Sequence, residues 1–420
     1  GSGSVYLYGT HLTDANNYLT FGEFFDDTVS YDGIETFYRK GDENFFLANL
    51  DTAGNINWSK VLGVKSDSIA TSLGAAQYLV DSLGNIYLSG FFKGDSLDLG
   101  GGYLTGSGND LDQVYLTKYD QAGNFQWAFT DSSYNDSYGG TQSRRIVKDQ
   151  NNNIILTGIL PEPARTVIGP DTLSSSGSYD IFMAKIDDMG NPIAAFSIGG
   201  VADELIRGLR IDNNNDIYVL LTSQSDTFSV DGQLLDNTSS TEAQVYLLKF
   251  SNSGSLLWHK DLGNPDPYNV GSWRLKINDQ NEVYVVSGFA NYSMTLGGET
   301  IYTHGGDDAL ISKFDASGNL LWANNIGGPL NDEISSVRIT NDEEIYFSGP
   351  LDTTMRVIGS DTIPKSESIG FFTGILNSNG NLTHLRVDTS RNINYVSQLS
   401  PHRLWPGPDS TFLMAGLYSQ

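Results

Sequence analysis

The sequence is built from an internal repeat. One segment recurs six times, and clear copies are FFLANLDTAGNINW from Phe45, VYLTKYDQAGNFQW from Val114 and ALISKFDASGNLLW from Ala309. A second segment lies between these copies, for example DSLGNIYLSG from Asp81 and NDQNEVYVVSG from Asn278. Such a long period is typical of repeat architectures in which neighbouring units bury a common core. The turn glycines of the first segment are Gly54, Gly123, Gly190, Gly254, Gly318 and Gly380.

Each segment alternates apolar and polar residues on both sides of a Gly, Asn or Asp turn, which predicts a β-hairpin. Two hairpins per repeat give a four-stranded sheet that cannot bury both faces alone, so radial stacking into a β-propeller is expected. A β-solenoid is the alternative, but it would need shorter repeats and parallel strands. We therefore expect an all-β propeller of four-stranded antiparallel blades, six complete or nearly complete plus a partial one, in a seven-bladed ring. The single domain spans 1–420, with blades at 1–63, 74–130, 143–199, 206–263, 272–328, 334–388 and, in part, 393–420.

The two ends of the sequence resemble the middle of a repeat. GSGSVYLYG at the start aligns without a gap on SLGNIYLSG at Ser82–Gly90, which predicts that the chain begins directly before the second strand of a blade. FLMAGLYSQ at Phe412–Gln420 is again a second strand. The sequence therefore predicts a chain truncated at both ends. The alternative is that Gly1–Ser4 is a vector-derived linker.

Charge and composition exclude several classes of function. The chain has 24 Lys and Arg against 50 Asp and Glu, a net charge of −26, which argues against a nucleic-acid binder because phosphate contacts need a basic surface. There is no cysteine, so disulfides, thiol nucleophiles and thiolate metal sites are excluded. The sequence contains no run of 18 apolar residues, so no membrane insertion is expected.

The repeat unit resembles the seven-bladed bacterial β-propeller repeat family over nearly the whole chain. The matching segments include Tyr115–Trp127, Asp180–Asn191 and Lys313–Gly328, while Ala194 and His384 depart from the tryptophan of the pattern. The resemblance implies a module of a large secreted or surface-exposed bacterial protein, often one exported by type IX secretion. It implies no shared active site, because propellers host many unrelated functions. The expected location is extracellular or at the cell surface.

An Asp-(Ser/Thr)-x triplet, with a small or aliphatic third residue, resembles the O-glycosylation sequon of Bacteroidota. It suggests a glycoprotein, and the alternative is that the repeats copy one Asp-Thr-Leu turn. The hydroxyls expected to carry glycans are Thr28, Ser68, Ser96, Thr172, Thr353 and Thr362.

Alternating strand directions place both short turns on one face and the longer connections on the opposite face, where binding sites are favoured. Basic residues gather in the first-strand segments that follow these connections. Aligning the repeats gives one register with Arg145, Arg274 and Arg403, and a second register, two residues on and so on the same strand face, with Arg210, Lys276 and Arg338.

Arginine forks suit carboxylate or sulfate, so these cations predict a site for an acidic ligand, either an acidic glycan or a carboxylate of a partner protein. The alternative is that each arginine neutralises an acidic residue of the propeller itself, with Asp67, Asp203 and Asp332 as its partners.

Aromatic residues recur in two kinds of position. Those in the long connections either stack on sugar rings or pack beneath the loops: Tyr134, Tyr138, Tyr268 and Trp273. The repeated Trp58, Trp127, Trp258 and Trp322 are expected to fill the gap between adjacent blades. The repeated lysines are expected to lay their stems along apolar surface with their heads in water; they are Lys118, Lys185, Lys249 and Lys313.

The sequence contains few signs of a catalytic site. The sequence has no His-Glu-x-x-His pattern, no Gly-x-Ser-x-Gly elbow and no phosphate loop. These observations favour a non-enzymatic binding, adhesion or spacer module whose partners are other domains of a longer chain, surface-assembly proteins or an acidic glycan. The alternative is a carbohydrate-active lyase or hydrolase with a carboxylate pair in the axial mouth. No cofactor is expected; calcium at Asp149–Asn153 (DQNNN) or Asp212–Asp216 (DNNND) is the weaker interpretation, because both occupy a hairpin turn.

Overall fold

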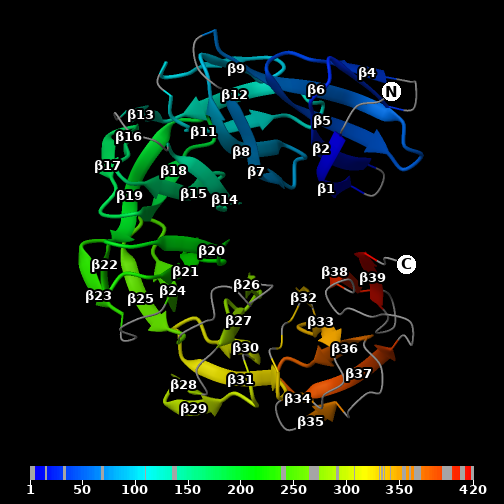
Figure 1. Ribbon diagram of the computed structural model, residues 1–420, viewed down its shortest axis with the longest axis vertical. Coiled ribbons are helices and arrows are strands. Elements are labelled where there is room, and N and C mark those ends of the chain that lie inside the picture. Colours follow the sequence, from blue (N-terminus) through cyan, green and yellow to red (C-terminus); the bar gives the residue numbers. More distant parts are fainter. Residues whose placement is uncertain are drawn as a thin grey trace. The chain divides into compact units, whose positions relative to one another are not determined.

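The computed structural model describes residues 5–417 apart from 15–16, 32–34, 68–70, 109, 135–139, 238–242, 264–273, 290–292, 307, 331, 333, 335, 341, 352–355, 359–360, 364–369, 390–399 and 407–411. The chain divides into two compact units (Figure 1). Unit 1 comprises Gly1–Leu205 and Thr227–Leu235, and unit 2 comprises Ile206–Asp226 and Asp236–Gln420. Among the described residues no helix is long and apolar enough to cross a membrane.

Antiparallel four-stranded sheets recur along the chain, each with its strands in chain order. The first three blades are β1 (Val5–Asp14), β2 (Asn17–Phe24), β5 (Glu43–Asp51) and β6 (Ile56–Lys65); β7 (Ser72–Val80), β8 (Ile86–Lys93), β11 (Gln113–Tyr119) and β12 (Phe125–Thr130); and β14 (Gln142–Lys148), β15 (Ile154–Pro161), β18 (Tyr179–Ile186) and β19 (Pro192–Gly200). A short strand, β13, follows the second blade at Ser132–Tyr134.

The same pattern continues in the second half of the chain. The next three blades are β20 (Glu204–Ile211), β21 (Ile217–Ser223), β24 (Gln244–Phe250) and β25 (Leu256–Asp261); β26 (Arg274–Ile277), β27 (Val283–Phe289), β30 (Asp308–Phe314) and β31 (Leu320–Gly327); and β32 (Ser336–Ile339), β33 (Ile345–Leu351), β36 (Gly370–Leu376) and β37 (Leu382–Thr389). A two-stranded sheet of β38 (Ser400–Pro406) and β39 (Phe412–Leu417) follows. The all-β class with four-stranded propeller blades is thus confirmed.

The assignment of the first strand from sequence is wrong. Val5–Asp14 was expected to begin with a second strand, but β1 pairs only with β2 among the described strands, and β2 in turn pairs with β5. β1 is therefore the first strand of its blade. The match between VYLYG and IYLSG reflects only the period-2 alternation that all such strands share.

Each complete blade also carries a small hairpin between its second and third strands, which the repeat alignment did not reveal. Three of these hairpins extend the sheet of the preceding blade: β9–β10 lies beyond β6, β22–β23 beyond β19, and β34–β35 beyond β31. The six hairpins are β3 (Thr28–Tyr31) with β4 (Glu35–Tyr38), β9 (Ser96–Asp98) with β10 (Tyr103–Thr105), β16 (Arg165–Ile168) with β17 (Asp171–Ser174), β22 (Thr227–Val230) with β23 (Gln233–Asp236), β28 (Ser293–Leu296) with β29 (Glu299–Tyr302), and β34 (Arg356–Ile358) with β35 (Asp361–Ile363).

Consecutive blades pack face to face within each unit. In unit 1, Val114 and Leu116 of the second blade share a buried cluster with Ile146 and Leu156 of the third. In unit 2, Leu220 of the fourth blade shares one with Val285 of the fifth, and the fifth and sixth share another. The hydrophobic sides that one blade cannot cover alone are thus covered by its neighbour.

The repeated tryptophans join adjacent blades, as expected. The Nε1 of Trp127 donates a 2.8 Å hydrogen bond to the carbonyl of Asp188, in the outer turn of the next blade. A Cβ on Gly190, whose φ is +88°, would lie 2.8 Å from the Trp127 ring, so this turn requires glycine. The same donation to the next blade recurs at Trp58, Trp258 and Trp322.

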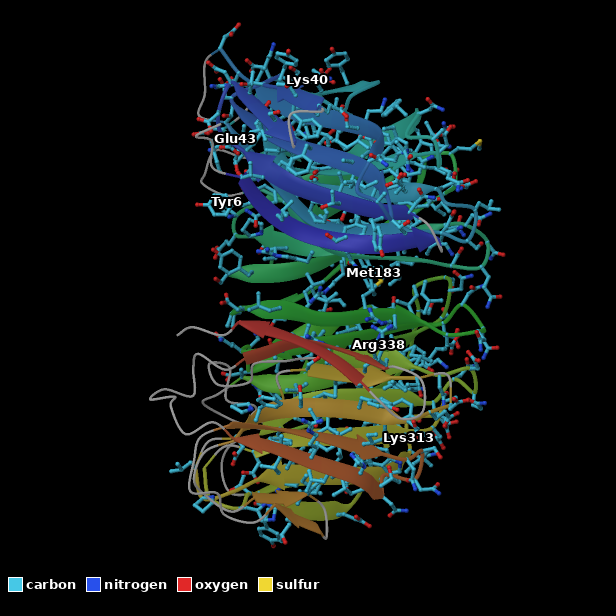
Figure 2. The ribbon with its side chains drawn as sticks, turned by 90° about the vertical axis from the view of Figure 1, so that its right-hand side faces the viewer. Tyr6, Lys40, Glu43, Met183, Lys313 and Arg338 are labelled. Atoms are coloured by element: carbon cyan, nitrogen blue, oxygen red, sulfur yellow. The ribbon has the colours of Figure 1, made fainter. Side chains whose placement is uncertain are left out.

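The prediction for the repeated lysines is wrong. Lys118, Lys249 and Lys313 are 9%, 5% and 4% exposed, and their ammonium groups form ion pairs rather than standing in water. Lys249 Nζ lies 3.2 Å from Asp212 Oδ2 and 3.0 Å from Asp216 Oδ2, above the ring of Tyr218. Lys313, labelled in Figure 2, pairs with a glutamate of its own blade and one of the next blade. Carboxylates of hairpin turns decide this outcome, from the next blade for Lys118, from the same blade for Lys249, and from both for Lys313.

Candidate functional site

Unit 2 brings together the basic residues of the predicted second register. Lys276 on β26 lies opposite Tyr284, and Arg338 on β32 lies opposite Tyr346, which are equivalent positions of adjacent blades. Arg338 is exposed and Lys276 is half-buried (Arg338 is labelled in Figure 2). Together with Arg210 on β20 they form what we call the basic cluster.

Electrostatics show that these side chains are close neighbours. Burial, and after it the positive charges of Arg210, Arg338 and Arg274, lower the pKa of Lys276 from the ordinary value of 10.5 to about 8. Like charges held together in a poorly hydrated place disfavour protonation. The basic cluster therefore has a local excess of positive charge within a strongly acidic protein.

The predicted alternative was neutralisation by acidic residues of the propeller. Within the described part of the chain, neither Lys276 nor Arg338 forms an ion pair. Asp332 uses its Oδ2 to accept a 2.6 Å hydrogen bond from the backbone N–H of Gly328. Asp203 lines a cavity of unit 1.

Among the other predicted ligand-binding residues, Arg274 belongs to unit 2 and its positive charge acts on Lys276. Arg145 lies in unit 1, opposite Thr157 on the neighbouring strand, and Arg274 lies opposite Val286 in unit 2. Arg403 is opposite Ala415 in β38, but its side chain is outside the described residues, as is that of Tyr134 in β13. Tyr138, Tyr268 and Trp273 also lie outside the described residues.

A cavity of about 540 Å³ in unit 1 was not predicted. Its wall includes Arg144 of β14, Tyr179 of β18, and Glu162 and Asp203 of two connections, which share no motif. Nearby, burial raises the pKa of Asp180 to about 7, with contributions from the charges of Glu204 and Glu162. Asp180 is fully buried, so it is not placed to meet a substrate as the acid of an enzyme would be.

Four of the six hydroxyls predicted as glycosylation sites lie on the added hairpins. Thr28, Thr172 and Thr362 are exposed on β3, β17 and β35, and Ser96 is half-buried on β9. Ser68 and Thr353 lie outside the described residues.

The turns at Asp149–Asn153 and Asp212–Asp216, the weaker prediction of a calcium site, use their carboxylates within the protein. Asp149 accepts hydrogen bonds from the backbone of Asn151 and Asn153 on Oδ1, and its Oδ2 lies 3.4 Å from Lys185 Nζ. Asp212 is held in the same manner by turn amides and Lys249. Across the described residues no group of three or more His, Asp or Glu side chains has a metal-binding arrangement.

Comparison with known proteins gives a distant relative. No family model matches the chain. An uncharacterized WD repeat-containing protein of Acanthamoeba polyphaga mimivirus is 22% identical over 431 residues, which cover 81% of this chain and 30% of that protein. The chain thus spans under a third of the length of this relative. The likeness and the repeated blades fit a binding or scaffold module.

Solved structures show weak likeness. One is a protein of unknown function from Bacteroides caccae, with 10% sequence identity and a TM-score of 0.33. The match covers 77% of this chain and 82% of the Bacteroides caccae chain. Another is a virginiamycin B lyase from Staphylococcus aureus, with 11% sequence identity and a TM-score of 0.30. The match covers 81% of this chain and 92% of the lyase chain. At such scores the strand pairing of the chain itself remains the observation that defines the fold.

Proposed function

We propose that this chain is a non-enzymatic binding module that recognises an anionic ligand, an acidic glycan or a carboxylate-bearing protein, through the basic cluster of Arg210, Lys276 and Arg338. One observation carries the proposal: a half-buried lysine is surrounded by arginine charge and forms no ion pair with a described carboxylate. Adjacent like charges are costly, and an incoming anion removes that cost.

The residue types favour carboxylate or sulfate. The planar guanidinium of arginine donates two parallel hydrogen bonds to such groups, while the lysine adds a point charge. The acidic remainder of the protein, with a net charge of −26, repels anions elsewhere on the surface. The ligand would therefore be directed to the basic cluster.

The cellular setting is part of the proposal. The resemblance to bacterial surface propellers suggests a secreted or cell-surface protein in which neighbouring domains or assembly proteins are partners. Exposed Thr28, Thr172 and Thr362 in the Asp-Thr triplets are consistent with glycosylation in such a location. Intact-mass measurement of the protein purified from its native host tests this part, because unmodified threonines would contradict it.

The binding site is tested with the full chain carrying Lys276→Met and Arg338→Gln. Polygalacturonate and dextran sulfate are the probes, with neutral dextran as the uncharged comparison. We expect at least a tenfold loss of affinity for the acidic polymer that binds. The matched control is Lys65→Met with Arg165→Gln, which removes the same two charges from exposed positions of unit 1. Equal loss in both double variants would show a non-specific charge effect and contradict the site.

A further inference from the structure

A small cavity of about 290 Å³ lies between the first and second blades, on the face that carries the short hairpin turns. It is lined by strands and turns of both blades. None of its lining residues is charged, in contrast to the corresponding place in later blades. The lining residues are Asn17, Asn49, Asn57, Trp58, Gly84, Ile86 and Gln121.

This cavity occupies the position where other blades hold an ion pair. Asn49 lies opposite Trp58 in the strand ladder, as Lys118 lies opposite Trp127. Trp58 Nε1 donates to the carbonyl of Gln121, as Trp127 donates to that of Asp188. Between the second and third blades, Lys118 Nζ and Asp188 Oδ1 are 2.5 Å apart and fill the interface. Between the first and second blades, the amides Asn49 and Gln121 replace the two partners of that pair.

The substitution leaves a hydrogen-bonded group of side-chain amides at this interface. Asn57 Nδ2 donates 2.8 Å hydrogen bonds to Asn49 Oδ1 and to Asn17 Oδ1. Asn49 is only 8% exposed and lines the cavity together with Asn17 and Asn57. A ligand hydroxyl that enters the cavity would therefore meet amide donors and acceptors rather than charged groups.

We propose that this amide pocket binds a neutral polyhydroxylated ligand, a single sugar residue. Amide groups both donate and accept, which matches neighbouring hydroxyls that do the same. The indole of Trp58 supplies an apolar wall for the C–H side of a sugar ring. The volume is near the lower end, roughly 300 Å³, of small-molecule pockets, and so suits one ring rather than a chain.

This site is independent of the basic cluster. It lies in unit 1 on uncharged residues, so it takes a neutral ligand where the basic cluster takes an anion. It also lies on the short-turn face, which the sequence had made the less favoured location for binding.

The repeat itself supplies the test variant. Asn49→Lys together with Gln121→Asp reproduces the Lys118–Asp188 pair and fills the pocket with a combination that the fold already accommodates. Glucose, galactose, mannose and N-acetylglucosamine are the probes, measured on the full chain by saturation-transfer NMR and tryptophan fluorescence. We expect at least one of them to bind with a Kd in the millimolar range, about 1 to 10 mM, and the double variant to bind it at least tenfold more weakly.

Two further variants make the result decisive. Asn57→Ala changes an exposed residue, so it tests the pocket even if the double variant does not fold, and it should weaken binding at least threefold. Asn151→Ala removes an exposed turn amide elsewhere in unit 1 and should leave binding unchanged, as should the Lys276 and Arg338 double variant. Failure of all four sugars to bind the unmodified chain overturns the proposal. So does full binding by the folded pocket variants.

Discussion

The indole Nε1 of Trp127 lies 2.8 Å from the carbonyl oxygen of Asp188, 61 residues further along the chain. This bond joins the outer strand of the second blade to the outer turn of the third, and its equivalents recur at three other tryptophans. The ring also packs against the cluster that both blades share. One tryptophan in each of four repeats thus contributes to the cohesion between adjacent blades.

Trp127→Ala should lower the free energy of unfolding by about 3 to 5 kcal/mol, the usual cost of removing a packed aromatic ring. Urea denaturation followed by circular dichroism measures the change. Met189→Ala, an exposed residue in the same turn, is the control and should change stability by less than about 0.5 kcal/mol. Equal stability of the tryptophan variant and the control would contradict the role given to Trp127.

Asp212→Ala should destabilise the protein by about 3 to 5 kcal/mol, because it leaves the buried ammonium of Lys249 with one carboxylate fewer and removes an acceptor for two turn amides. The hydrogen bonds and charges of Tyr218, Asp216 and Asp212 raise the pKa of Lys249 although burial lowers it, so the lysine stays charged. Thermal and urea unfolding check the effect. Asp279→Ala, in an exposed turn position, should be nearly neutral; a similarly small effect at Asp212 would exclude a stabilising ion pair.

Anion binding at the basic cluster should take up protons near pH 8. The pKa of Lys276 lies at about 8 in the free protein, and a bound anion raises it, so affinity falls as the pH rises above 8. Calorimetric heats of binding at pH 8 should therefore differ between Tris and HEPES buffers, which have different ionisation enthalpies. Lys276→Met should abolish that difference, and identical heats in the two buffers for the unmodified chain would argue against the assignment.

Asp180→Asn should flatten the pH dependence of stability between about pH 4 and 7. Burial raises the pKa of Asp180 to about 7 from 3.8, so the folded state keeps a proton that the unfolded state releases. Stability contributed by this group is present at low pH and is lost as the pH rises through 7. Denaturation midpoints at pH 4.5, 6 and 8 test this, with the exposed Asp26→Asn as control. An unchanged profile would show that Asp180 does not titrate in this window.

Phe228→Ala should destabilise the sheet that the β22–β23 hairpin extends. Phe228 has no exposed surface and pairs with Gly200 of the preceding blade, so the loss is expected to be about 3 to 5 kcal/mol. Urea unfolding and resistance to proteolysis of the hairpin are the measurements. Leu234→Ala, 70% exposed on β23, should leave both unchanged. A Phe228 variant as resistant as that control would mean that the hairpin does not contribute to the sheet.

Features that recur in every repeat could be predicted from the sequence. Features that depend on contacts with an adjacent blade could not. Trp127 and Gly190 recur with the period, and the aligned hairpins place Lys276 and Arg338 in one register. The ammonium group of Lys118 was expected to be solvated, because its ion-pair partner, Asp188, belongs to the next blade and is not apparent from the repeat. Asn49 indicates a pocket only once the ion pair at the equivalent position of the next blade is known. From the sequence alone, a single Asn in one repeat looks like random variation between repeats.

The hairpins between the second and third strands of each blade could not be predicted from the repeat either. Their strands are only three or four residues long, too short for a period to be recognised. Three of the six hairpins pair with the preceding blade rather than with their own. Burial of Leu97 and Leu104 against the first and second blades, rather than local propensity, holds β9 and β10 in place.

This overlapping connectivity has a bearing on how such a chain can change in evolution. The hairpins β9–β10, β22–β23 and β34–β35 complete the sheet of the preceding blade. The boundaries of a sequence repeat therefore differ from the boundaries of a hydrogen-bonded sheet. Excising one sequence repeat would remove strands from two sheets, whereas a breakpoint placed after such a hairpin would leave the earlier sheet whole. Duplications that survive are therefore expected to have their junctions inside blades, between the hairpin and the third strand.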